Sequence, residues 1–313
     1  MGDFALALLI GYVLDLLLGD PEGLTHPVCL IGRYIGFCEK RLRARGGSLR
    51  GAAVLLTAST VLLTMACAAA VLAAASLLGR WPRLIAMAVL DWLGLAARCL
   101  AKEALGVGAA LGRSVAAGRE QVARIVGRDT QALSGEEIVK ATVETVAENT
   151  CDGVIAPMLY AALGGPVLLW GFKAASTLDS MVGYLDPRYR DIGWSSARLD
   201  DVLNYVPARL TALLLCLGAA VCNLDAKNAL RIVRRDHSNH KSPNCAWSEA
   251  AAAGALHIRL GGTHLYFGRP VEKPTIGDAD RAAEIPDIGR VCGMMYAAGA
   301  AMMAIILALR WLA

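Results

Sequence analysis

The stretch GAAVLLTASTVLLTMACAAAVLAAASLLG, residues 51–79, decides the fold class of this chain. It has no charged side chain in 29 residues, whereas about 20 apolar residues cross the hydrocarbon core of a bilayer. The composition agrees, because 56% of the residues are hydrophobic, only four are Phe, and the mean hydropathy is +0.48. The chain is therefore predicted to be an all-α polytopic integral membrane protein.

Five further apolar segments predict additional membrane helices. They are 4–18, interrupted by Asp15; 84–101, with Asp91 and Arg98; 154–170; 206–222; and 292–313. About five helices are expected to contact lipid. The segment 154–170 contains Pro157 and the Gly164-Gly165-Pro166 break, which predicts a broken or re-entrant segment, tolerated at membrane depth only when buried in protein. The number of membrane crossings stays open. An even number of crossings between the polar motifs would place these motifs on the same side of the membrane and form a single site. A site buried at membrane depth would also be a single site.

Charge and cysteine content narrow the class further. Residues 33–50 carry six basic side chains against one acid, Glu39, so this segment is predicted to lie in the cytoplasm, with 51–79 and 84–101 forming a hairpin that returns there. The net charge of +4 is too small to indicate a nucleic-acid partner. The N-terminus lacks the basic region and cleavage site of a signal peptide and is expected to stay in the mature protein. Nine cysteines without CxxC spacing are predicted to be small buried hydrophobes, not disulfides or zinc ligands.

Polar regions separate the apolar segments, and the whole chain, 1–313, is predicted to form one membrane-embedded domain. These regions are 19–50, 102–153, 171–205 and 223–291. In the first, Asp20 and His26 each precede a proline, so both are expected to be extended. They fit either a surface turn or a ligand site that includes Asp15 and Arg33.

The second region contains ETVAENTCDG, residues 144–153. Ser134 and Glu137 predict a capping box that opens a helix ending close to Asp152. On that helix Glu144, Glu148 and Asp152 would stack along one face, so either water screens their charges or a cation lies among them. The alternative is a solvated face with Lys140 and Glu144 as an i, i+4 pair.

The stretch 171–214, which begins with the third region, is the densest in polar residues. Its first part has side chains that could bind phosphate and metal together, namely Lys173, Ser176, Thr177, Asp179 and Ser180. Its second part places further polar side chains at near-helical spacing, namely Arg198, Asp200, Asp201, Asn204 and Arg209. Such oxygen ligands suit Mg²⁺, which usually takes one or two carboxylates plus substrate phosphates. Ordinary charges at a membrane interface fit the same pattern.

Within the fourth region, the stretch 242–268 combines a Ser242-Pro243-Asn244 turn with Glu249 on an Ala-rich helix and a Gly261-Gly262 turn that could cradle a phosphate. His237 and His240 have metal-ligand spacing without a third ligand nearby and are predicted to face solvent. The chain has no GxxxxGK[ST], GxGxxG, HExxH or GxSxG motif, so any nucleotide chemistry would use a different kind of site.

Taken in order, these motifs resemble one known family. HPVCLIGRYIG, VAENTCDGVIAPMLYAALGG, KAASTLDSMVGY, RYRDIGWSSARLDDVLNYVPARLTALL and SPNCAWSEAAAAGALHIRLGGTHLYFG are similar to the adenosylcobinamide-phosphate synthase family of cobalamin biosynthesis, from about residue 11 to 312. The chain departs from the family pattern at Ser176, where Asn is usual, and at Cys151, where Ser or a small apolar residue is common.

The resemblance implies a polytopic membrane enzyme that joins adenosylcobyric acid to an aminoalcohol, usually (R)-1-aminopropan-2-ol phosphate, with ATP and Mg²⁺. It implies ADP as a product and hence an acyl phosphate, although the residues themselves leave an adenylate open. The expected location is the inner membrane with the active site facing the cytoplasm. The expected partners are the two substrates, membrane lipid and other enzymes of the cobalamin pathway.

Roles are assigned to the polar residues on this basis. Metal binding and acid–base chemistry are expected from a pool of acids, namely Glu144, Glu148, Asp152, Asp179, Asp200 and Asp201, and the metal ligands are sought among the four aspartates. The triphosphate or acyl phosphate would be bound by Lys173, Arg198 and Arg209 and oriented by Asn149 and Asn204. The aminoalcohol phosphate or corrin side chains would be held by His26, Arg33 and Asn244. The base that deprotonates the ammonium would be Glu249 or one of the helix acids.

Two other classes remain as alternatives. A transporter would use Asp15 and Asp91 in a proton or ion pathway, but no inverted repeat is visible in the sequence. A non-catalytic membrane scaffold would have solvated acid clusters.

Overall fold

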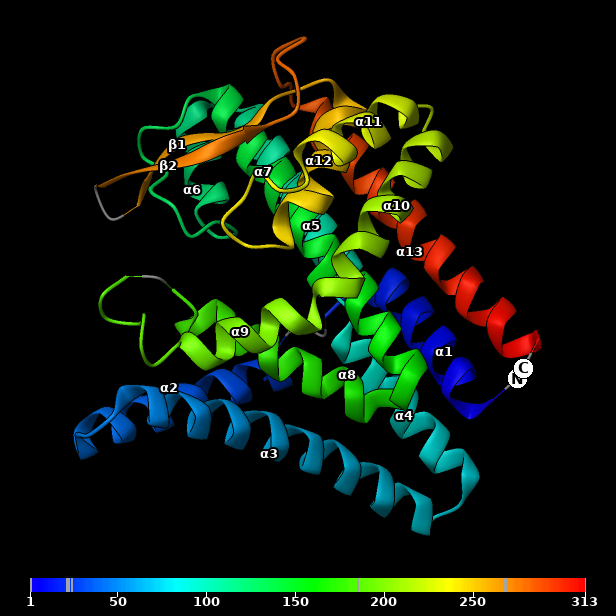
Figure 1. Cartoon of the computed structure of the whole chain (residues 1–313). Helices are drawn as coiled ribbons and strands as arrows, with labels where there is room; N and C mark the ends of the chain where they lie inside the picture. Colours follow the sequence, from blue (N-terminus) through cyan, green and yellow to red (C-terminus); the bar gives the residue numbers. More distant parts are fainter. Residues whose placement is uncertain (1, 21–22, 24, 185, 267–268, 313) are drawn as a thin grey trace. The chain divides into compact units, whose positions relative to one another are not determined.

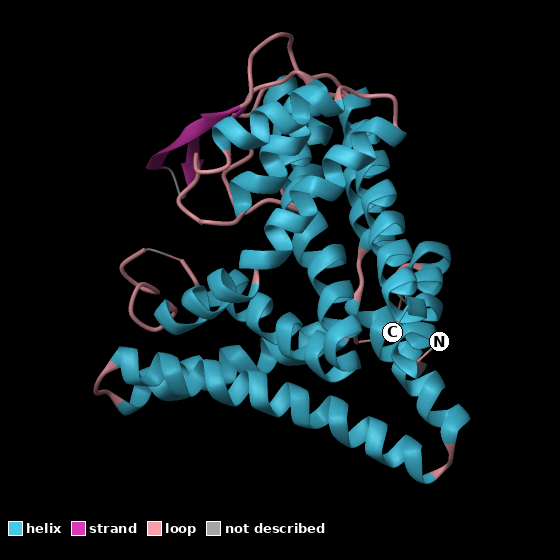
Figure 2. Cartoon of the chain, turned by 45° about the vertical axis from the view of Figure 1, so that its right-hand side comes forward, coloured by secondary structure: helices cyan, strands magenta, loops and turns pink. Residues whose placement is uncertain are grey.

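The computed structural model describes residues 2–20, 23, 25–184, 186–266 and 269–312 (Figure 1). Within this part, helices form nearly all the regular structure, and the only sheet is an antiparallel hairpin of β1 (Leu260–Tyr266) and β2 (Arg269–Ile276) (Figure 2). The predicted all-α class is confirmed. The chain divides into two compact units: unit 1 is Met1–Ala96, Ala156–Asn204 and Ile305–Ala313, and unit 2 is Ala97–Ile155 and Tyr205–Ala304.

Unit 1 is built from helices that pack around α8. Its elements are α1 (Asp3–Leu18), α2 (Pro27–Arg45), α3 (Leu49–Leu77), α4 (Arg80–Gly94), α8 (Ala156–Val182), α9 (Trp194–Leu203) and the last residues of α13 (Pro286–Leu312). The α1–α4 contact depends on small residues, because a Cβ at Gly11 would lie 2.8 Å from the backbone nitrogen of Trp92. The indole of Trp170 on α8 donates to the carbonyl of Leu90, 3.1 Å away, and ties α8 to α4.

Helix α8 contains the predicted break. Gly164 has φ −145° and ψ 22°, Gly165 has φ 67°, and Pro166 follows inside the helix. Only glycine adopts the positive φ of Gly165 without strain, and Pro166 cannot donate a helical hydrogen bond. The prediction of a broken segment at this point is confirmed.

Unit 2 contains the hairpin and the remaining helices. They are α5 (Ala97–Leu111), α6 (Val115–Val122), α7 (Gly135–Thr150), the π-helical turn η1 (Cys151–Ile155), α10 (Tyr205–Val221), α11 (Ala226–Asp236), α12 (Cys245–Leu256) and most of α13. One apolar core joins α5, α6 and α7 through Val107, Val122, Leu133, Ile138 and Ala141. A second contact region surrounds α12, which packs against α7, α10, α11 and β2.

Four helical stretches of the described chain are long and apolar enough to cross a membrane. They are Leu49–Leu77, Arg80–Leu111, Gly135–Val182 and Pro286–Leu312, and the bent pair Trp194–Leu203 with Tyr205–Val221 gives a fifth if it is counted as one span. The protein is therefore a multi-pass membrane protein, and residues 51–79 lie almost entirely within the first span, as predicted. Helix α1 has 16 residues, fewer than the ~20 that a span needs.

The nine cysteines are all free, as predicted, but they are not uniformly buried. Cys151, Cys216 and Cys292 are buried, whereas Cys29 and Cys67 are exposed and the other four are half-buried. Exposed positions such as Cys67, on the long apolar helix α3, suit contact with lipid. The sequence pattern could not distinguish burial in protein from exposure to lipid.

Candidate active site

Helix α7 supplies the first two acids of the site. It begins at the predicted capping box, in which Ser134 accepts from the backbone of Glu137 and the Glu137 carboxylate accepts from the backbone of Ser134. The helical backbone does not stop near Asp152 as expected, because α7 passes into the π-helical turn η1. A π turn is wider than an α turn, so Asp152 is displaced from the straight i+4 row on which Glu144 and Glu148 lie.

Glu144 is held by two groups from distant parts of unit 2. Its carboxylate forms an ion pair with Arg128, with Nη2 and Oε2 2.5 Å apart, and the exposed fractions of the two side chains are 13% and 5%. The backbone N–H of Gly261 donates to the other oxygen at 2.8 Å. The predicted alternative pairing of Glu144 with Lys140 is wrong, because Lys140 pairs with Glu136, one turn earlier.

Glu148 and Glu249 complete a group that we name the acid cluster: Glu144, Glu148 and Glu249. The thiol of Cys245 on α12 donates to Glu148 Oε1 at 3.1 Å. Glu249, one turn further along α12, is buried. Burial and then the negative charges of Glu144 and Glu148 raise the pKa of Glu249 well above its ordinary value, against the smaller opposite effects of Lys273 and Arg128.

Small side chains fix the position of α12. Its residues from Ala250 to Leu256 are all buried, and most of them are alanine. At Gly254 a Cβ would lie 2.7 Å from the Cα of Ala229 and 2.8 Å from the carbonyl oxygen of Asn228, so α11 and α12 are nearly in backbone contact there. The backbone that carries Glu249 is therefore held by its neighbours at close range.

The hairpin and the chain before α12 bring a cation and a histidine near the acid cluster. Burial, followed by the positive charge of Lys273 on β2, lowers the pKa of His240, while the charges of Glu148 and Glu144 act in the opposite direction. His240 Nδ1 accepts from the backbone of Ser242 at 3.0 Å. His237 packs on the indole of Trp247, with ring centroids 4.4 Å apart. Both histidines are half-buried, so the prediction that they face solvent is wrong.

Arg209 is placed at the start of α12 by aromatic rings. Its guanidinium lies over Tyr205 at 3.5 Å and over Trp247 at 4.7 Å, measured to the ring centroids. Its Nη1 also donates to the side-chain oxygen of Asn244 at 3.5 Å. Ser242, Pro243 and Asn244 form the predicted turn, which leads into α12. The structure therefore brings together Arg209 and Asn244, two residues for which different ligands were predicted.

The Gly261-Gly262 pair has a different role from the predicted one. Both residues have positive φ, 74° and 100°, at an irregularity in the pairing of β1 with β2. A Cβ at Gly261 would lie 2.3 Å from the carbonyl oxygen of Pro274. Because the Gly261 N–H already donates to Glu144, this turn orients a carboxylate and is not an open phosphate cradle.

Unit 1 carries a second group of predicted residues on α9, which we name the α9 polar face: Arg198, Asp200, Asp201 and Asn204. The amide of Asn204 donates to Asp200 Oδ2 at 3.0 Å, which is the predicted i, i+4 pair. Arg198 Nη1 lies 3.5 Å from Asp201 Oδ2. Asn204 is buried and Arg198 is exposed, so the face extends from protein to surface.

The other predicted residues lie on several elements of the two units. In unit 1, His26 caps α2 by accepting from the Val28 N–H at 3.2 Å, and its extended backbone agrees with the prediction. Arg33 is exposed on α2, and Lys173 and Asp179 are half-buried on α8. Pro21, which follows Asp20, lies outside the described residues. In unit 2, Asp152 is half-buried in η1, and the Asn149 amide donates to its own helix at the Thr145 carbonyl.

The donor chemistry of these residues suits Mg²⁺ that is delivered with phosphate. Among the described residues, no three His, Cys, Asp or Glu side chains are grouped so that they could hold a metal ion by themselves. Asp200 and Asn204 bring a carboxylate and a side-chain amide next to each other, with the amide nitrogen donating to the carboxylate. Mg²⁺ is commonly held by one or two carboxylates plus substrate phosphates, so paired oxygens fit that ion.

Sequence reasoning missed several residues of the acid cluster's surroundings. Arg128, Cys245, Trp247 and Lys273 have contacts or charge effects on the site, yet none was selected, although Cys245 and Trp247 lie within a quoted motif. Arg128 precedes Glu144 by 16 residues and lies outside α7. In the sequence, Arg128 is only a basic residue in a segment that resembles a loop. This pattern does not identify its partner.

Comparison with known proteins assigns the family. The family model described as CobD/Cbib protein matches residues 8–295. A cobalamin biosynthesis protein CobD of Citrobacter koseri is 46% identical over 311 residues, covering 98% of each chain. A protein of the same name from Geobacter metallireducens is 48% identical over 279 residues, covering 89% of this chain and 88% of the relative. No solved structure matches. With a match to the family model across nearly its whole length, this chain belongs to the CobD/CbiB family of cobalamin biosynthesis proteins.

Proposed function

We propose that this protein is an ATP-dependent amide ligase that joins adenosylcobyric acid to (R)-1-aminopropan-2-ol phosphate, or a related aminoalcohol, to give adenosylcobinamide phosphate. Membership of a cobalamin biosynthesis family supports the pathway. The observation that carries the proposal is Glu249, a buried carboxylate with a raised pKa, which lies with Glu144 and Glu148 among the charges of Arg128 and Lys273.

Amide formation needs two changes of reactivity. A carboxylate is a poor acyl donor, so one carboxylate oxygen of the corrinoid attacks the γ-phosphorus of ATP, releasing ADP and forming an acyl phosphate. The amine then attacks the carbonyl carbon, and inorganic phosphate leaves. The substrate ammonium must first lose a proton, and a carboxylate whose pKa is raised is a stronger base than an ordinary one. We assign that role to Glu249.

The cationic and metal-binding residues act on the phosphates. Lys173, Arg198 and Arg209 are candidates to neutralise the triphosphate and acyl phosphate, since phosphoryl transfer depends on positioning and charge. Mg²⁺ would be held by one or two of Asp152, Asp179, Asp200 and Asp201 together with nucleotide phosphates. When bound, it would supply charge neutralisation at the phosphoryl oxygens. Asn204 would orient Asp200, to which it is hydrogen-bonded.

The membrane location gives this chemistry a physical reason. Excluding water protects an acyl phosphate from hydrolysis and strengthens electrostatic interactions. We place the protein in the inner membrane with the active site facing the cytoplasm, because of the basic segment 33–50. Co-localisation of a scarce corrinoid with other pathway enzymes is a second use of the same location.

The direct test is product formation by the purified, detergent-solubilised protein. Adenosylcobyric acid, aminopropanol phosphate and Mg·ATP should give the mass of the amide together with stoichiometric ADP. AMP and pyrophosphate in place of ADP would replace the acyl phosphate by an adenylate. Absence of the amide under conditions in which an established synthase is active would refute the ligase.

Substitutions of single acids test the site. Asp152→Asn and Asp201→Asn should each reduce turnover strongly while the protein remains in the membrane fraction. A matched control is Glu272→Gln on β2, where the side chain is exposed and lies outside the proposed site. Rates near those of the control would remove the substituted acid from the site.

One observation favours a second candidate, a transporter. Asp91 on α4 is buried within unit 1, and neither of its carboxylate oxygens has a hydrogen-bond partner among the described residues. Buried acids of this kind occur in proton and ion pathways. The Asp91→Asn variant separates the two functions, because it should leave amide formation largely unchanged if the protein is a ligase in which Asp91 has only a structural role.

A further inference from the structure

Helix α11 has one face with concentrated positive charge. Its buried side is formed by Ala229, Ile232, Val233 and Asp236. Its exposed side carries the residues that we name the cationic face: Lys227, Arg231, Arg234 and Arg235. These four side chains, with Leu230, line a hollow in the surface. A charged face of this kind is often simply solvated, so a binding role requires further observations.

Ion pairs with neighbouring acids hold two of the four basic side chains, Arg231 and Arg235, in place. The face keeps an excess of positive charge. Asp278 binds Arg231 at 2.5 Å and Arg235 at 2.7 Å, and Arg235 also pairs with Asp236. Hydrogen bonds from Arg235 and Arg231 lower the pKa of Asp278, so this carboxylate remains charged between them. No ion pair of Lys227 or Arg234 is present among the described residues. The face is therefore partly preorganised and not neutralised.

The neighbouring helix indicates what lies beside this face. Leu213, Leu217 and Val221 on α10 follow one another at i+4 spacing, and their exposed fractions are 58%, 49% and 65%. Helix α10 forms with α9 the bent pair that gives a fifth span if it is counted as one, so such a stripe on it is expected to contact hydrocarbon. The stripe ends at Val221, the last residue of α10, and α11 begins at Ala226. The cationic face thus follows a lipid-facing stripe directly in the chain.

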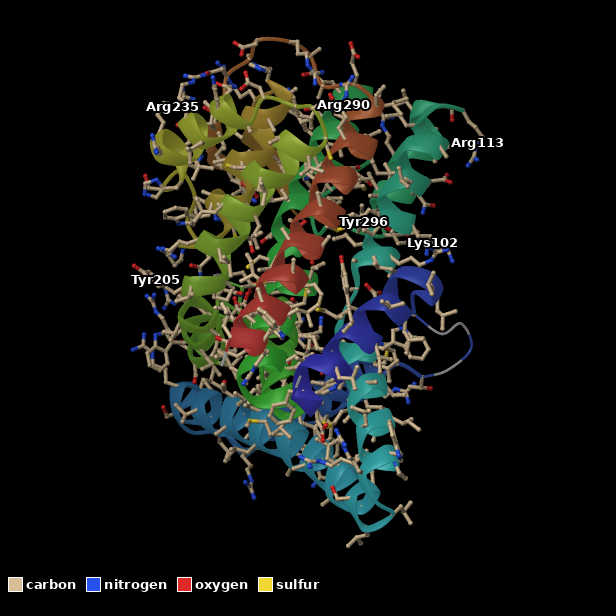
Figure 3. The ribbon with its side chains drawn as sticks, turned by 90° about the vertical axis from the view of Figure 1, so that its right-hand side faces the viewer. Lys102, Arg113, Tyr205, Arg235, Arg290 and Tyr296 are labelled. Carbon is tan, nitrogen blue, oxygen red and sulfur yellow. The ribbon has the colours of Figure 1, made fainter. Side chains whose placement is uncertain are left out.

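The side-chain view agrees with this arrangement inside unit 2. Helix α10 begins at Tyr205, and in Figure 3 Arg235 projects outward beyond the other end of this helix. Arg290, near the start of α13, lies toward the same end as Arg235. Basic side chains just outside an apolar span are placed where phospholipid headgroups lie.

We propose that the cationic face of α11 binds the phosphate groups of anionic phospholipids at the membrane surface. Lys227 and Arg234 would contact headgroup oxygens, and Arg231 and Arg235, oriented by Asp278, would add to the local positive potential. This surface shares no residue with the acid cluster or the α9 polar face, and lipid binding to it requires no catalytic activity.

Lipid titration of the full chain in a neutral detergent tests the proposal. Fluorescent phosphatidylglycerol is the probe, and phosphatidylcholine with the same acyl chains is the uncharged reference. The variant Lys227→Gln/Arg234→Gln removes the two cations whose loss breaks no ion pair, and it should weaken phosphatidylglycerol binding roughly 30-fold. The charge-conserving variant Lys227→Arg/Arg234→Lys should bind as the wild type does. Binding should also weaken between 0.05 and about 0.5 M salt, because counterions screen it.

Matched controls separate this surface from a general effect of charge. Lys241→Gln/Arg259→Gln removes two exposed cations outside α11 and should leave binding unchanged. Equal weakening by this control, or equal binding of the two lipids by the wild type, would overturn the proposal. Displacement of the lipid by inorganic phosphate at constant ionic strength would identify a site for free phosphate and would also overturn it.

Discussion

The acid cluster of unit 2 and the α9 polar face of unit 1 contain similar side chains but are held in different ways. Glu144 and Glu148 contact groups that are 117 and 97 residues away in sequence, and Glu249 is buried between them and the rest of α12. The hydrogen bond and the ion pair described on α9 join residues four and three positions apart, and Arg198 is exposed. The described contacts of the acid cluster therefore depend on the tertiary fold, whereas those of the α9 polar face are local in sequence.

The largest effect is expected for Glu249→Gln, which keeps the shape and removes the base. Amide formation should fall about 10²–10⁴-fold, the usual contribution of general base catalysis. In the wild type, turnover should rise with pH through the raised pKa of Glu249, and the variant should lack this rise. The measurement is the pH profile of kcat in detergent. A variant with normal turnover would exclude Glu249 as the base.

The same variant has an opposite expectation for stability. The folded protein holds the Glu249 proton more tightly than the unfolded chain does. In the unfolded chain the pKa of Glu249 has its ordinary value of 4.5. Stability from this group is therefore full below pH 4.5 and is lost as the pH rises through the raised pKa. Glu249→Gln should remove this loss, so the variant should gain stability relative to the wild type at the higher pH.

The second prediction concerns the ion pair that supports Glu144. Arg128→Met leaves a largely buried carboxylate without its cation and should cost about 3–5 kcal/mol of unfolding free energy. The double variant Arg128→Met/Glu144→Gln should recover part of that loss, because no uncompensated charge remains. Equilibrium unfolding in detergent measures both. A loss below ~1 kcal/mol, as for an exposed pair, would show that the cluster is solvated.

A smaller effect is expected where α7 begins. Ser134→Ala removes the side-chain acceptor of the capping box and should cost about 1 kcal/mol, without changing the acids themselves. Ser134→Asp, which can also cap, is the control and should restore stability. If the alanine variant lost activity and kept full stability, the cap would affect the site directly and not through the helix.

The smallest effect is expected on α9. The Arg198–Asp201 pair is exposed on its arginine side, with 70% of that side chain accessible, and its closest atoms are 3.5 Å apart. Arg198→Gln should change stability by less than ~0.5 kcal/mol. If Arg198 binds phosphate, the variant should still show a raised KM for ATP. A large loss of stability would show that the α9 polar face, like the acid cluster, contributes strongly to the stability of the fold.

Sequence reasoning succeeded where one segment contains the whole signal. The uncharged stretch 51–79, the capping box at Ser134 and the Gly164-Gly165-Pro166 break depend on neighbouring residues, and all three occur in the structure. It failed where the partner is distant. The choice of Arg128 over Lys140 as the partner of Glu144 depends on the tertiary fold, since i, i+4 spacing permits the wrong pair equally well.

The π turn and the glycine pair show a second limit. Nothing in CDGVI, residues 151–155, distinguishes a π turn from the end of a helix, because both tolerate the same small residues. At Gly261 the positive φ suits a phosphate cradle as well as a strand irregularity, and only the position of α7 directs its N–H to Glu144. The expected roles of His26, Arg33, Lys173 and Asp179 stay predictions, and these residues belong to unit 1, whereas the acid cluster belongs to unit 2.

The tight packing of helix α12 limits which amino-acid substitutions this protein can tolerate. Its buried run of small residues leaves no side-chain rotamers to absorb a change in volume, and at Gly254 the gap to Ala229 is too small even for a methyl group. A larger residue would move the helix axis, and Glu249 would move with it as part of the same rigid body. Substitutions accumulated over evolution in this helix should therefore be confined to exchanges among glycine, alanine and serine, even at positions that never contact a substrate.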